Sequence, residues 1–288
     1  MIISRLIGGL GNQMFQYAAG RSLAIANSCE LRLDISGFEN YALHNGYELD
    51  LFNIKAQIAS TKDVSKLVST NHSRLSRYIS RQLGIKKSTH FIEKSFTFDH
   101  KFFDAKPPVY LDGYWQSYKY FESIESQLRH EFSLKYYLSK LNLDTSEQIS
   151  SVNAVSVHIR RGDYVSNKHT NSVHGVCSLD YYRSAIKTIT ERVDNPVFFI
   201  FSDDIAWVKD NLAISSGAVY VDHNSGRQSY NDMYLMSLCQ HHIIANSSFS
   251  WWGAWLGSNP NKIVISPKQW FINDTITDDL IPKSWVRL

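Results

Sequence analysis

The segment with the clearest chemical content is VHIRRGDY, residues 157–164. Side chains alternate between the two faces of a strand, so His158 and Arg160 share one face and emerge together at its carboxyl end. A guanidinium group offers a planar fork of donors that suits phosphate oxygens. The segment therefore predicts an anion site built on Arg160. The alternative is an ion pair that only stabilises the strand end, with Arg161 pinning the loop, for example against Asp163.

A second segment, IIANSSFSWWGAW at residues 243–255, predicts a buried strand that runs directly into a helix. The start of a helix presents free backbone N–H groups and the positive end of the helix dipole, and serine hydroxyls add further donors. Ser247 and Ser248 are therefore candidate ligands of a diphosphate. The alternative is that one of them only caps the helix. We expect most of the tryptophans in this segment to pack in the core.

The third segment, GGLGNQ at residues 8–13, lies between a predicted strand and a predicted helix, where a phosphate-binding loop would lie. It fits neither the GxGxxG pattern nor the P-loop pattern of nucleotide sites. Its glycines, Gly11 among them, still let a ligand approach the backbone closely. Asn12 stands at the helix start, where it either contacts a ligand or only caps the helix.

Two acidic residues, Asp203 and Asp204, follow the apolar run 198–201. Either could accept hydrogen bonds from a nucleotide, but capping of the next helix is the favoured interpretation. The sequence lacks the Asp-x-Asp motif of metal-dependent sugar transferases, so neither a metal nor another cofactor is predicted. One loop holds a small group of possible metal ligands whose spacing matches no standard zinc pattern: His169, His174 and Cys177.

The strands and helices predicted around these residues indicate an α/β protein. A strand, a helix and a strand are predicted at 2–7, 13–26 and 30–35, which is a βαβ beginning. In the second half, apolar strands without polar alternation are separated by helices, which indicates a parallel sheet covered on both faces. Ligands of such sheets bind beyond the carboxyl ends of the strands, where the motifs lie. The predicted strands of this half are 152–160, 196–202, 218–221, 242–245 and 262–266, and the predicted helices are 179–193, 204–212, 230–240 and 248–256.

The middle of the chain has weaker patterns. Residues 62–83 mix basic, serine and apolar residues and predict exposed helices. Residues 120–141 carry apolar side chains at helical spacing and predict one long helix. The polar run 142–151 predicts a linker between domains.

Length and composition place the chain among ordinary globular proteins. It has 288 residues, of which 43% are hydrophobic and 20% charged, so disorder and fibrous repeats are excluded. The formal charge of +3 is too small a bias to argue for nucleic acid or a membrane surface as a partner. The polar linker divides the chain into expected domains at 1–148 and 149–288.

The cysteines and the N-terminal residues indicate the compartment. Cys29, Cys177 and Cys239 form no CxxC pair and read as free thiols in a reducing environment. The first residues hold no continuous apolar run of a signal peptide, and no segment approaches the ~20 apolar residues that would span a bilayer. We therefore expect a cytoplasmic protein, with at most peripheral association with the inner face of a membrane.

The motif segments together resemble glycosyltransferase family 11, the α-1,2-fucosyltransferases. The matching segments are GGLGNQMFQ at 8–16, HIRRGDY at 158–164 and NSSFSWWGAW at 246–255, and FSDD at 201–204 matches a fourth, looser block. The occurrence of all of them in this order makes the resemblance specific. It implies a GT-B architecture, in which two Rossmann-like α/β domains face each other across a cleft.

The resemblance also implies an activity. This activity is the metal-independent transfer of L-fucose from GDP-fucose to the 2-hydroxyl of a terminal galactose, with inversion at the sugar carbon. The acceptor would be an oligosaccharide or a surface-glycan precursor such as that of an O-antigen, and the missing membrane anchor favours the bacterial type of the family. The N-terminal domain would handle the acceptor, with acceptor specificity in the weakly patterned stretch 38–141. The C-terminal domain would bind GDP-fucose.

Donor-binding roles follow from the same resemblance. The His-x-Arg-Arg motif is similar to that of protein and core-glycan fucosyltransferases, which assigns the β-phosphate to Arg160 and the nucleoside to His158. Further positions that match the family near the donor are Ser247, Ser248 and Asp203 or Asp204.

Roles at the reaction centre rest on two further residues. The glycine turn is similar to one in protein O-fucosyltransferases, which places Asn12 at the reaction centre and Gly11 beside the donor. Asp163 is our hypothesis for the base that deprotonates the acceptor, because it lies just past Arg160. If the transition state is loose and cation-like, the leaving phosphate could take the proton instead.

Three competing functions differ in substrate or in class. The nearest is another GDP-sugar transferase that forms a different linkage. A catalytically silent GDP-binding module would bind the nucleotide without releasing GDP from a sugar donor. An NAD-dependent oxidoreductase is disfavoured, because no dinucleotide fingerprint follows the first strand of either half.

Overall fold

The computed structural model describes residues 1–39, 44–68, 89–214, 217–273 and 275–288. These residues form two compact units. Unit 1 comprises Met1–Lys135 together with Asp278–Leu280, and unit 2 comprises Tyr136–Thr277 together with Ile281–Leu288. Among the described residues, no helix is both long and apolar enough to cross a membrane.

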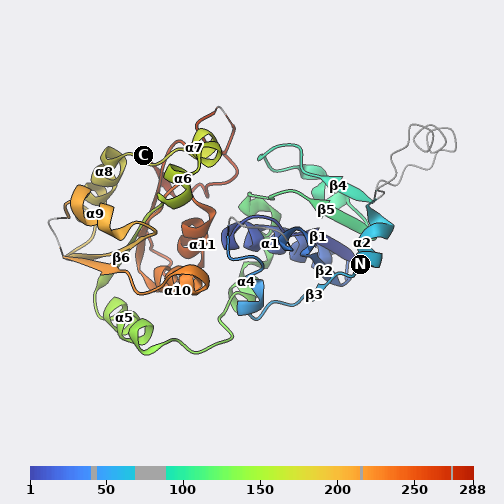
Figure 1. Cartoon of the computed structure of the whole chain (residues 1–288), viewed down its shortest axis with the longest axis horizontal. Coiled ribbons are helices and arrows are strands. Elements are labelled where there is room, and N and C mark those ends of the chain that lie inside the picture. Colours follow the sequence, from blue (N-terminus) through green and yellow to red (C-terminus); the bar gives the residue numbers. More distant parts are fainter. Residues whose placement is uncertain (40–43, 69–88, 215–216, 274) are drawn as a thin grey trace. The chain divides into compact units, whose positions relative to one another are not determined.

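Unit 1 is built on a parallel five-stranded sheet with the order β3-β2-β1-β5-β4. Helix α1, Leu10–Ala26, follows β1 almost directly and leads into β2, so the predicted βαβ beginning is confirmed. The helix is buried along most of its length and lies beside β1 and β2 in Figure 1. The strands are β1 (Ile2–Arg5), β2 (Leu31–Asp34), β3 (Gln57–Ile58), β4 (His90–Ile92) and β5 (Val109–Asp112).

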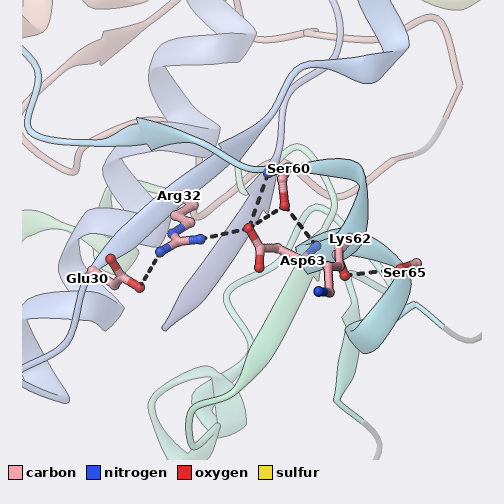
Figure 2. A network of polar contacts seen from close by, with 6 residues as sticks. All are labelled: Glu30, Arg32, Ser60, Lys62, Asp63 and Ser65. Atoms are coloured by element: carbon pink, nitrogen blue, oxygen red, sulfur yellow. Dashed lines mark hydrogen bonds and ion pairs between the residues drawn. The ribbon is translucent and has the colours of Figure 1, made fainter.

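Helix α2, Thr61–Leu67, begins with a reciprocal capping box (Figure 2). The Ser60 hydroxyl accepts a hydrogen bond from the backbone N–H of Asp63 at 3.1 Å, and the Asp63 carboxylate accepts one from the N–H of Ser60 at 3.3 Å. The same carboxylate pairs with Arg32 on β2 at 2.7 Å, which ties the helix start to the sheet. Helix α2 covers the first part of the predicted exposed helices, and the remainder from residue 69 lies outside the described residues.

The predicted long helix over 120–141 is wrong. The chain forms two 3-10 turns and then only the short helix α4, Glu125–Glu131. Beyond α4, Leu134 forms an antiparallel β-bridge with Phe52. This pairing with a distant segment draws the backbone out of the helix, and local periodicity cannot reveal it.

Glu131, at the end of α4, forms a buried ion pair inside unit 1. Its carboxylate accepts hydrogen bonds from Arg21 Nη2 at 2.9 Å and from the hydroxyl of Tyr17, both on α1. Replacing Glu131 by glutamine leaves Arg21 without its charged partner, and we expect the free energy of unfolding to fall by about 3–5 kcal/mol in urea unfolding. The control Glu125→Gln removes an exposed pair with Arg129 on the same helix and should cost less than about 1 kcal/mol. Equal losses in the two variants would contradict this account.

Unit 2 is built on a parallel six-stranded sheet with the order β11-β10-β9-β6-β7-β8, so the predicted parallel α/β arrangement is confirmed. Its strands are β6 (Asn153–Ile159), β7 (Pro196–Ser202), β8 (Ala218–Val221), β9 (His241–Ile243), β10 (Val264–Ser266) and β11 (Val286–Arg287). Its main helices are α8 (Leu179–Thr190), α9 (Ile205–Asn211), α10 (Tyr230–Leu238) and α11 (Ser248–Leu256).

The two faces of the unit 2 sheet carry different side chains. On one face, β6 packs apolar residues against α8 and α9: Val155, Val157 and Ile159. On the other face, the Ser156 hydroxyl lies 2.9 Å from His242 Nδ1, and the ring of His158 contacts Phe249 of α11. Helices α10 and α11 lie on this second face, as Figure 1 shows. The polar residues of β6 therefore point toward α10 and α11.

The tryptophans and cysteines of the chain behave as expected. The three tryptophans of α11 are buried: Trp251, Trp252 and Trp255. The three cysteines are free thiols: Cys29, Cys177 and Cys239.

The boundary between the units precedes the expected position at 148/149. The polar run 142–151, predicted as a linker, is instead helix α5, Lys140–Ser150. Helix α5 packs against α10 and β6, and the side chain of Asn142 on α5 donates to Asn224 Oδ1 at 3.0 Å. These contacts make α5 a part of unit 2.

Candidate active site

A cluster of charged side chains lies at the carboxyl ends of β6 and β7 in unit 2. Arg160 Nη2 donates to Asp163 Oδ1 at 2.5 Å, and Arg160 Nη1 pairs with Asp203 Oδ2 at 2.8 Å. Burial disfavours the charged form of Arg160, but the attraction of Asp203 and Asp163 outweighs it and raises the pKa of the guanidinium. Arg160 is therefore a permanent cation whose orientation two carboxylates determine. We call these three residues the Arg160 cluster.

Neighbouring charges in the same loops have separate partners. Arg161 pairs with Asp204 rather than with Asp163: its Nε lies 3.1 Å from Asp204 Oδ2, and its guanidinium carbon lies 3.5 Å from the centre of the Trp207 ring. Asp204 also accepts from the backbone N–H of Trp207 at 3.2 Å, so the predicted cap of α9 is confirmed for this residue. Asp203 instead accepts from the backbone N–H of Arg161 at 2.8 Å, which fixes it within the Arg160 cluster.

Gly162 begins the short helix α6, Gly162–Ser166, directly against Asp203. A Cβ atom at this position would lie 2.5 Å from Asp203 Oδ2, the oxygen that pairs with Arg160. Only a residue without a Cβ lets this carboxylate keep its place.

Arg160 retains donors for a ligand. A guanidinium has five N–H groups, and each carboxylate of the cluster occupies one terminal nitrogen. The Nε atom is buried and has no hydrogen-bond partner among the described residues. Because the two carboxylates also neutralise the guanidinium, a diphosphate would use the remaining donors or displace one carboxylate.

Two residues that the sequence reasoning did not single out join this loop to the loop before α11. The guanidinium carbon of Arg160 lies 5.5 Å from the centre of the Tyr164 ring, and the Tyr164 hydroxyl donates to the carbonyl of Asn246 at 3.2 Å. The buried side chain of Asn246 donates to the carbonyl of His174 at 2.8 Å. Both residues lie inside the motif segments, so the signal was present, but their partners are far away in the sequence.

His158 lies on the face of β6 that α11 covers. Its ring is buried and lies 5.7 Å from the ring of Phe249, centre to centre. Burial lowers the pKa of His158 well below its usual value in spite of the nearby Asp203, so the ring is neutral at pH 7. Its Nδ1 atom has no hydrogen-bond partner among the described residues. A neutral imidazole with an unused nitrogen suits a hydrogen bond with a nucleoside.

The start of α11 is capped by Ser247, whose hydroxyl accepts from the backbone N–H of Phe249 at 3.3 Å. The capping alternative is therefore confirmed for Ser247. Ser248 is the first residue of the helix and is partly exposed. The first N–H groups of a helix have no acceptor within the helix. The N–H groups of this turn other than that of Phe249 are therefore the candidate donors for the predicted phosphate role.

The predicted residues of the glycine turn lie in unit 1. Helix α1 begins at Leu10 with Gly9 as its N-cap, so the capping alternative for Asn12 is wrong. Asn12 Oδ1 instead accepts a hydrogen bond from Gln116 Nε2 at 2.8 Å, in the loop after β5. Gly11 is buried in the first turn of α1. The sequence reasoning missed Gln116, because no motif marks that loop.

The possible metal ligands predicted in one loop do not lie in a loop together: His169 and His174 belong to the short helix α7, Lys168–His174, and only Cys177 follows it. The ring of His174 stacks on Tyr164 with centres 4.9 Å apart, and the Cys177 thiol donates to Asn246 Oδ1 at 3.4 Å. Within the part of the chain that the structure describes, no group of three or more His, Cys, Asp or Glu side chains is placed to hold a metal ion.

The comparison with protein families decides to which family these motifs belong. The model described as Glycosyl transferase family 11 matches residues 2–288. The chain belongs to glycosyltransferase family 11. The resemblance of the motif segments is thus confirmed, and the family match extends over almost the whole chain.

Two relatives of this family-11 glycosyltransferase come from Escherichia coli. Alpha-1,2-colitosyltransferase is 39% identical over 295 residues, which cover 100% of this chain and 99% of that protein. O-antigen biosynthesis glycosyltransferase WbnK is 34% identical over 99% of this chain and 99% of that protein.

A solved structure shows the same fold at low sequence identity. NodZ alpha-1,6-fucosyltransferase, known from Bradyrhizobium and here in crystals soaked with GDP-fucose, is 15% identical with a TM-score of 0.52. The match covers 90% of the family-11 chain and 96% of the NodZ chain. Together with the two parallel α/β units, it confirms the predicted GT-B fold class.

Proposed function

We propose that this family-11 glycosyltransferase transfers L-fucose from GDP-fucose to the 2-hydroxyl of a terminal galactose in an oligosaccharide or surface-glycan precursor. The observation that carries the proposal is the Arg160 cluster, a guanidinium held by two carboxylates at the carboxyl end of β6. The motif resemblance supplies the donor and the acceptor. The names of the relatives, an α-1,2-colitosyltransferase and an O-antigen glycosyltransferase, support a 1,2-linkage and a surface-glycan acceptor.

The transfer requires fixed donors at the diphosphate. The acceptor oxygen forms a bond to the fucose carbon while the bond from that carbon to the phosphate oxygen breaks, which inverts the centre and leaves negative charge on GDP. Without a metal, N–H groups that already point at the phosphate must stabilise this charge. Arg160 and the first turn of α11, at Ser247 and Ser248, supply such groups in unit 2. His158 then contacts the nucleoside.

Asn12 is the proposed substrate contact of unit 1. Gln116 occupies its Oδ1 at 2.8 Å, which leaves the Nδ2 group to donate. The backbone of Gly11, one residue earlier, is the second proposed contact there.

The donor sugar has one specific second candidate. Colitose is L-fucose without its 3-hydroxyl, and the relative with 39% identity is named for colitose. A site that hydrogen-bonds the 3-hydroxyl of fucose would reject colitose, because polar groups of the protein would be left unpaired. Acceptance of both sugars would indicate that no protein group contacts that hydroxyl.

Incubation of the protein with GDP-fucose or GDP-colitose and a panel of galactosides, in the presence of EDTA, tests the proposal. We expect GDP release and a fucosylated product whose NMR spectrum assigns an α-1,2 linkage. A colitosylated product alone would establish the second candidate, and another linkage would overturn the acceptor position. GDP binding without GDP release from either donor would show a silent binding module.

The pairing of Asp163 with Arg160 favours a positioning role for this carboxylate over that of the acceptor base. We expect Asp163→Asn to lower kcat about tenfold, since a hydrogen bond to a charged group contributes roughly 1.5–3 kcal/mol and Asp203 still holds the guanidinium. The KM for the donor should not rise, because the variant has lost one of the negative charges that repel the diphosphate. The pH dependence of kcat should keep its shape, whereas loss of its acidic limb would establish Asp163 as the base.

A further inference from the structure

Glu93, directly after β4 in unit 1, is a half-buried carboxylate to which the proposed reaction gives no role. Strands β4 and β5 pair in parallel, so the turn that follows β5 lies beside Glu93. The carboxylate accepts the backbone N–H groups of Tyr114 at 2.7 Å and of Trp115 at 3.0 Å, one on each oxygen. A Cβ at Gly113 would lie 2.3 Å from Glu93 Cβ, so only glycine lets the turn approach this closely. We call residues 113–116 the Trp115 turn.

Trp115 has a left-handed backbone conformation in this turn, with a φ of 56°. This conformation is unfavourable for a residue that carries a Cβ atom. Its buried ring packs against those of Phe102 and Tyr120, with centres 5.1 and 5.5 Å apart, while Glu93 holds its N–H. Backbone strain of this kind persists where the surroundings hold it, and it is concentrated at sites that bind or react. The residue that follows it is Gln116.

Gln116 connects the Trp115 turn to the glycine turn after β1. Strand β5 also pairs with β1, so the segments that follow the two strands are neighbours. Gln116 Nε2 donates to Asn12 Oδ1 at 2.8 Å and thereby orients the amide of Asn12. Gly8 leaves room for this amide, because a Cβ there would lie 2.5 Å from Asn12 Nδ2. Gln116 Oε1 is buried and has no hydrogen-bond partner among the described residues. An unsatisfied buried acceptor is expected where a ligand supplies the donor.

We propose that Glu93 is a positioning residue of the transfer: its ionised carboxylate fixes the Trp115 turn, so that Gln116 holds the amide of Asn12 in the orientation that meets the substrate. The inference rests on the proposed substrate contact of Asn12 and deepens it. When Glu93 gains a proton, it loses the charge that strengthens both hydrogen bonds, and one oxygen becomes a donor that faces an N–H group. The Trp115 turn is then held less firmly, and Asn12 loses its fixed orientation.

The charge of Glu93 is set by its surroundings in unit 1. Burial raises the pKa of Glu93 to about 7, although the N–H groups of Tyr114 and Trp115 lower it. The other titratable groups that face it are the hydroxyls of Tyr114 and Tyr120, whose pKa values are raised by burial, so both are neutral at pH 7. We therefore expect kcat to fall as the pH falls through about 7, where Glu93 gains its proton.

The pH dependence of kcat in the wild type, Glu93→Gln and Glu122→Gln tests the inference. A glutamine amide accepts only one of the two N–H groups, so kcat of Glu93→Gln at about pH 8 should be about tenfold lower, as loss of a hydrogen bond to a charged group predicts. The limb near pH 7 should vanish, since glutamine does not titrate. GDP affinity should stay unchanged in calorimetry, because the proposed diphosphate contacts lie in unit 2. The control Glu122→Gln changes an exposed carboxylate and should keep the kcat and the limb of the wild type. An unchanged limb in Glu93→Gln would overturn the inference.

Gln116→Met separates positioning from a merely structural role. Methionine has a similar length but cannot donate to Asn12, so kcat should fall about tenfold. If Glu93 acts through Gln116, adding Glu93→Gln to this variant should lower kcat by less than about twofold more, because the two residues then belong to one coupled unit. Independent losses that multiply to about 100-fold would overturn the inference.

Melting temperatures measured without substrate test the ionisation of Glu93 separately from the reaction. The folded protein binds the Glu93 proton more tightly than the unfolded chain does, so the stability that it contributes is lost as the pH rises from about 4.5 through about 7. The melting temperature of the wild type should therefore fall relative to that of Glu93→Gln between about pH 5 and about pH 8. A constant difference over this range would overturn the inference. A wild type that shows the expected fall but transfers neither fucose nor colitose would instead overturn the proposed function.

Discussion

Replacement of Arg160 by alanine is expected to lower the turnover of GDP-fucose by about 10²–10³-fold, the range found when one donor to a developing oxyanion is removed. The guanidinium of Arg160 lies at the carboxyl end of β6, and two carboxylates hold its fork in one orientation. Without it, Asp163 and Asp203 remain as partly buried negative charges where the diphosphate must bind. The loss should therefore appear in donor affinity as well as in kcat. GDP release under saturating acceptor measures the rate, and calorimetry measures the affinity.

Arg160→Lys and Arg183→Ala are the matched controls for this prediction. Lysine keeps the charge but not the planar fork, so Arg160→Lys should recover only a small part of the activity. Arg183 pairs with Asp180 at 3.0 Å on the exposed surface of α8, and its removal should leave turnover unchanged. Wild-type turnover in Arg160→Ala would refute the proposed phosphate site. The melting temperature of each variant shows whether a loss of activity reflects unfolding.

Gly162→Ala is expected to lower turnover by about 10²-fold, the loss that a misplacement of about 1 Å at a reacting group can cause. The added methyl would lie 2.5 Å from Asp203 Oδ2, so this carboxylate must turn away. Arg160 then loses its 2.8 Å contact with Asp203, and the backbone N–H of Arg161 loses its acceptor. A single methyl group would thus disturb the cluster without changing any charge.

The control for this substitution is Gly217→Ala in the same unit. Among the described residues, leaving aside its chain neighbours, nothing lies within 4 Å of a Cβ added at Gly217, so the variant should have wild-type turnover. We expect the crystal structure of Gly162→Ala to show Asp203 in another rotamer. Full activity of Gly162→Ala with Asp203 displaced would mean that Asp203 is not needed to hold Arg160.

The wrong predictions share one physical cause. The apolar spacing of 120–141 is compatible with a long helix, but the β-bridge between Leu134 and Phe52 stabilises an extended backbone there. The polar run 142–151 lacks an apolar face wide enough to predict a core helix, yet it lies in helix α5. Ser139 caps this helix, and the buried side chain of Asn142 hydrogen-bonds to the loop after β8. In both places, contacts with a distant segment of the chain outweigh the secondary structure that the local sequence favours.

By itself, the sequence determined the class of fold and pointed to the strand ends at which we propose that the donor binds. Strands of a covered parallel sheet are apolar on both faces, and helix starts carry serine, so both can be recognised within a few residues. The sequence thus located Arg160, His158 and the start of α11. Only the tertiary structure decided which groups contact them. Asp203 pairs with Arg160, and Tyr164 with the loop of Asn246, because folding joins segments whose separation along the chain no local pattern encodes.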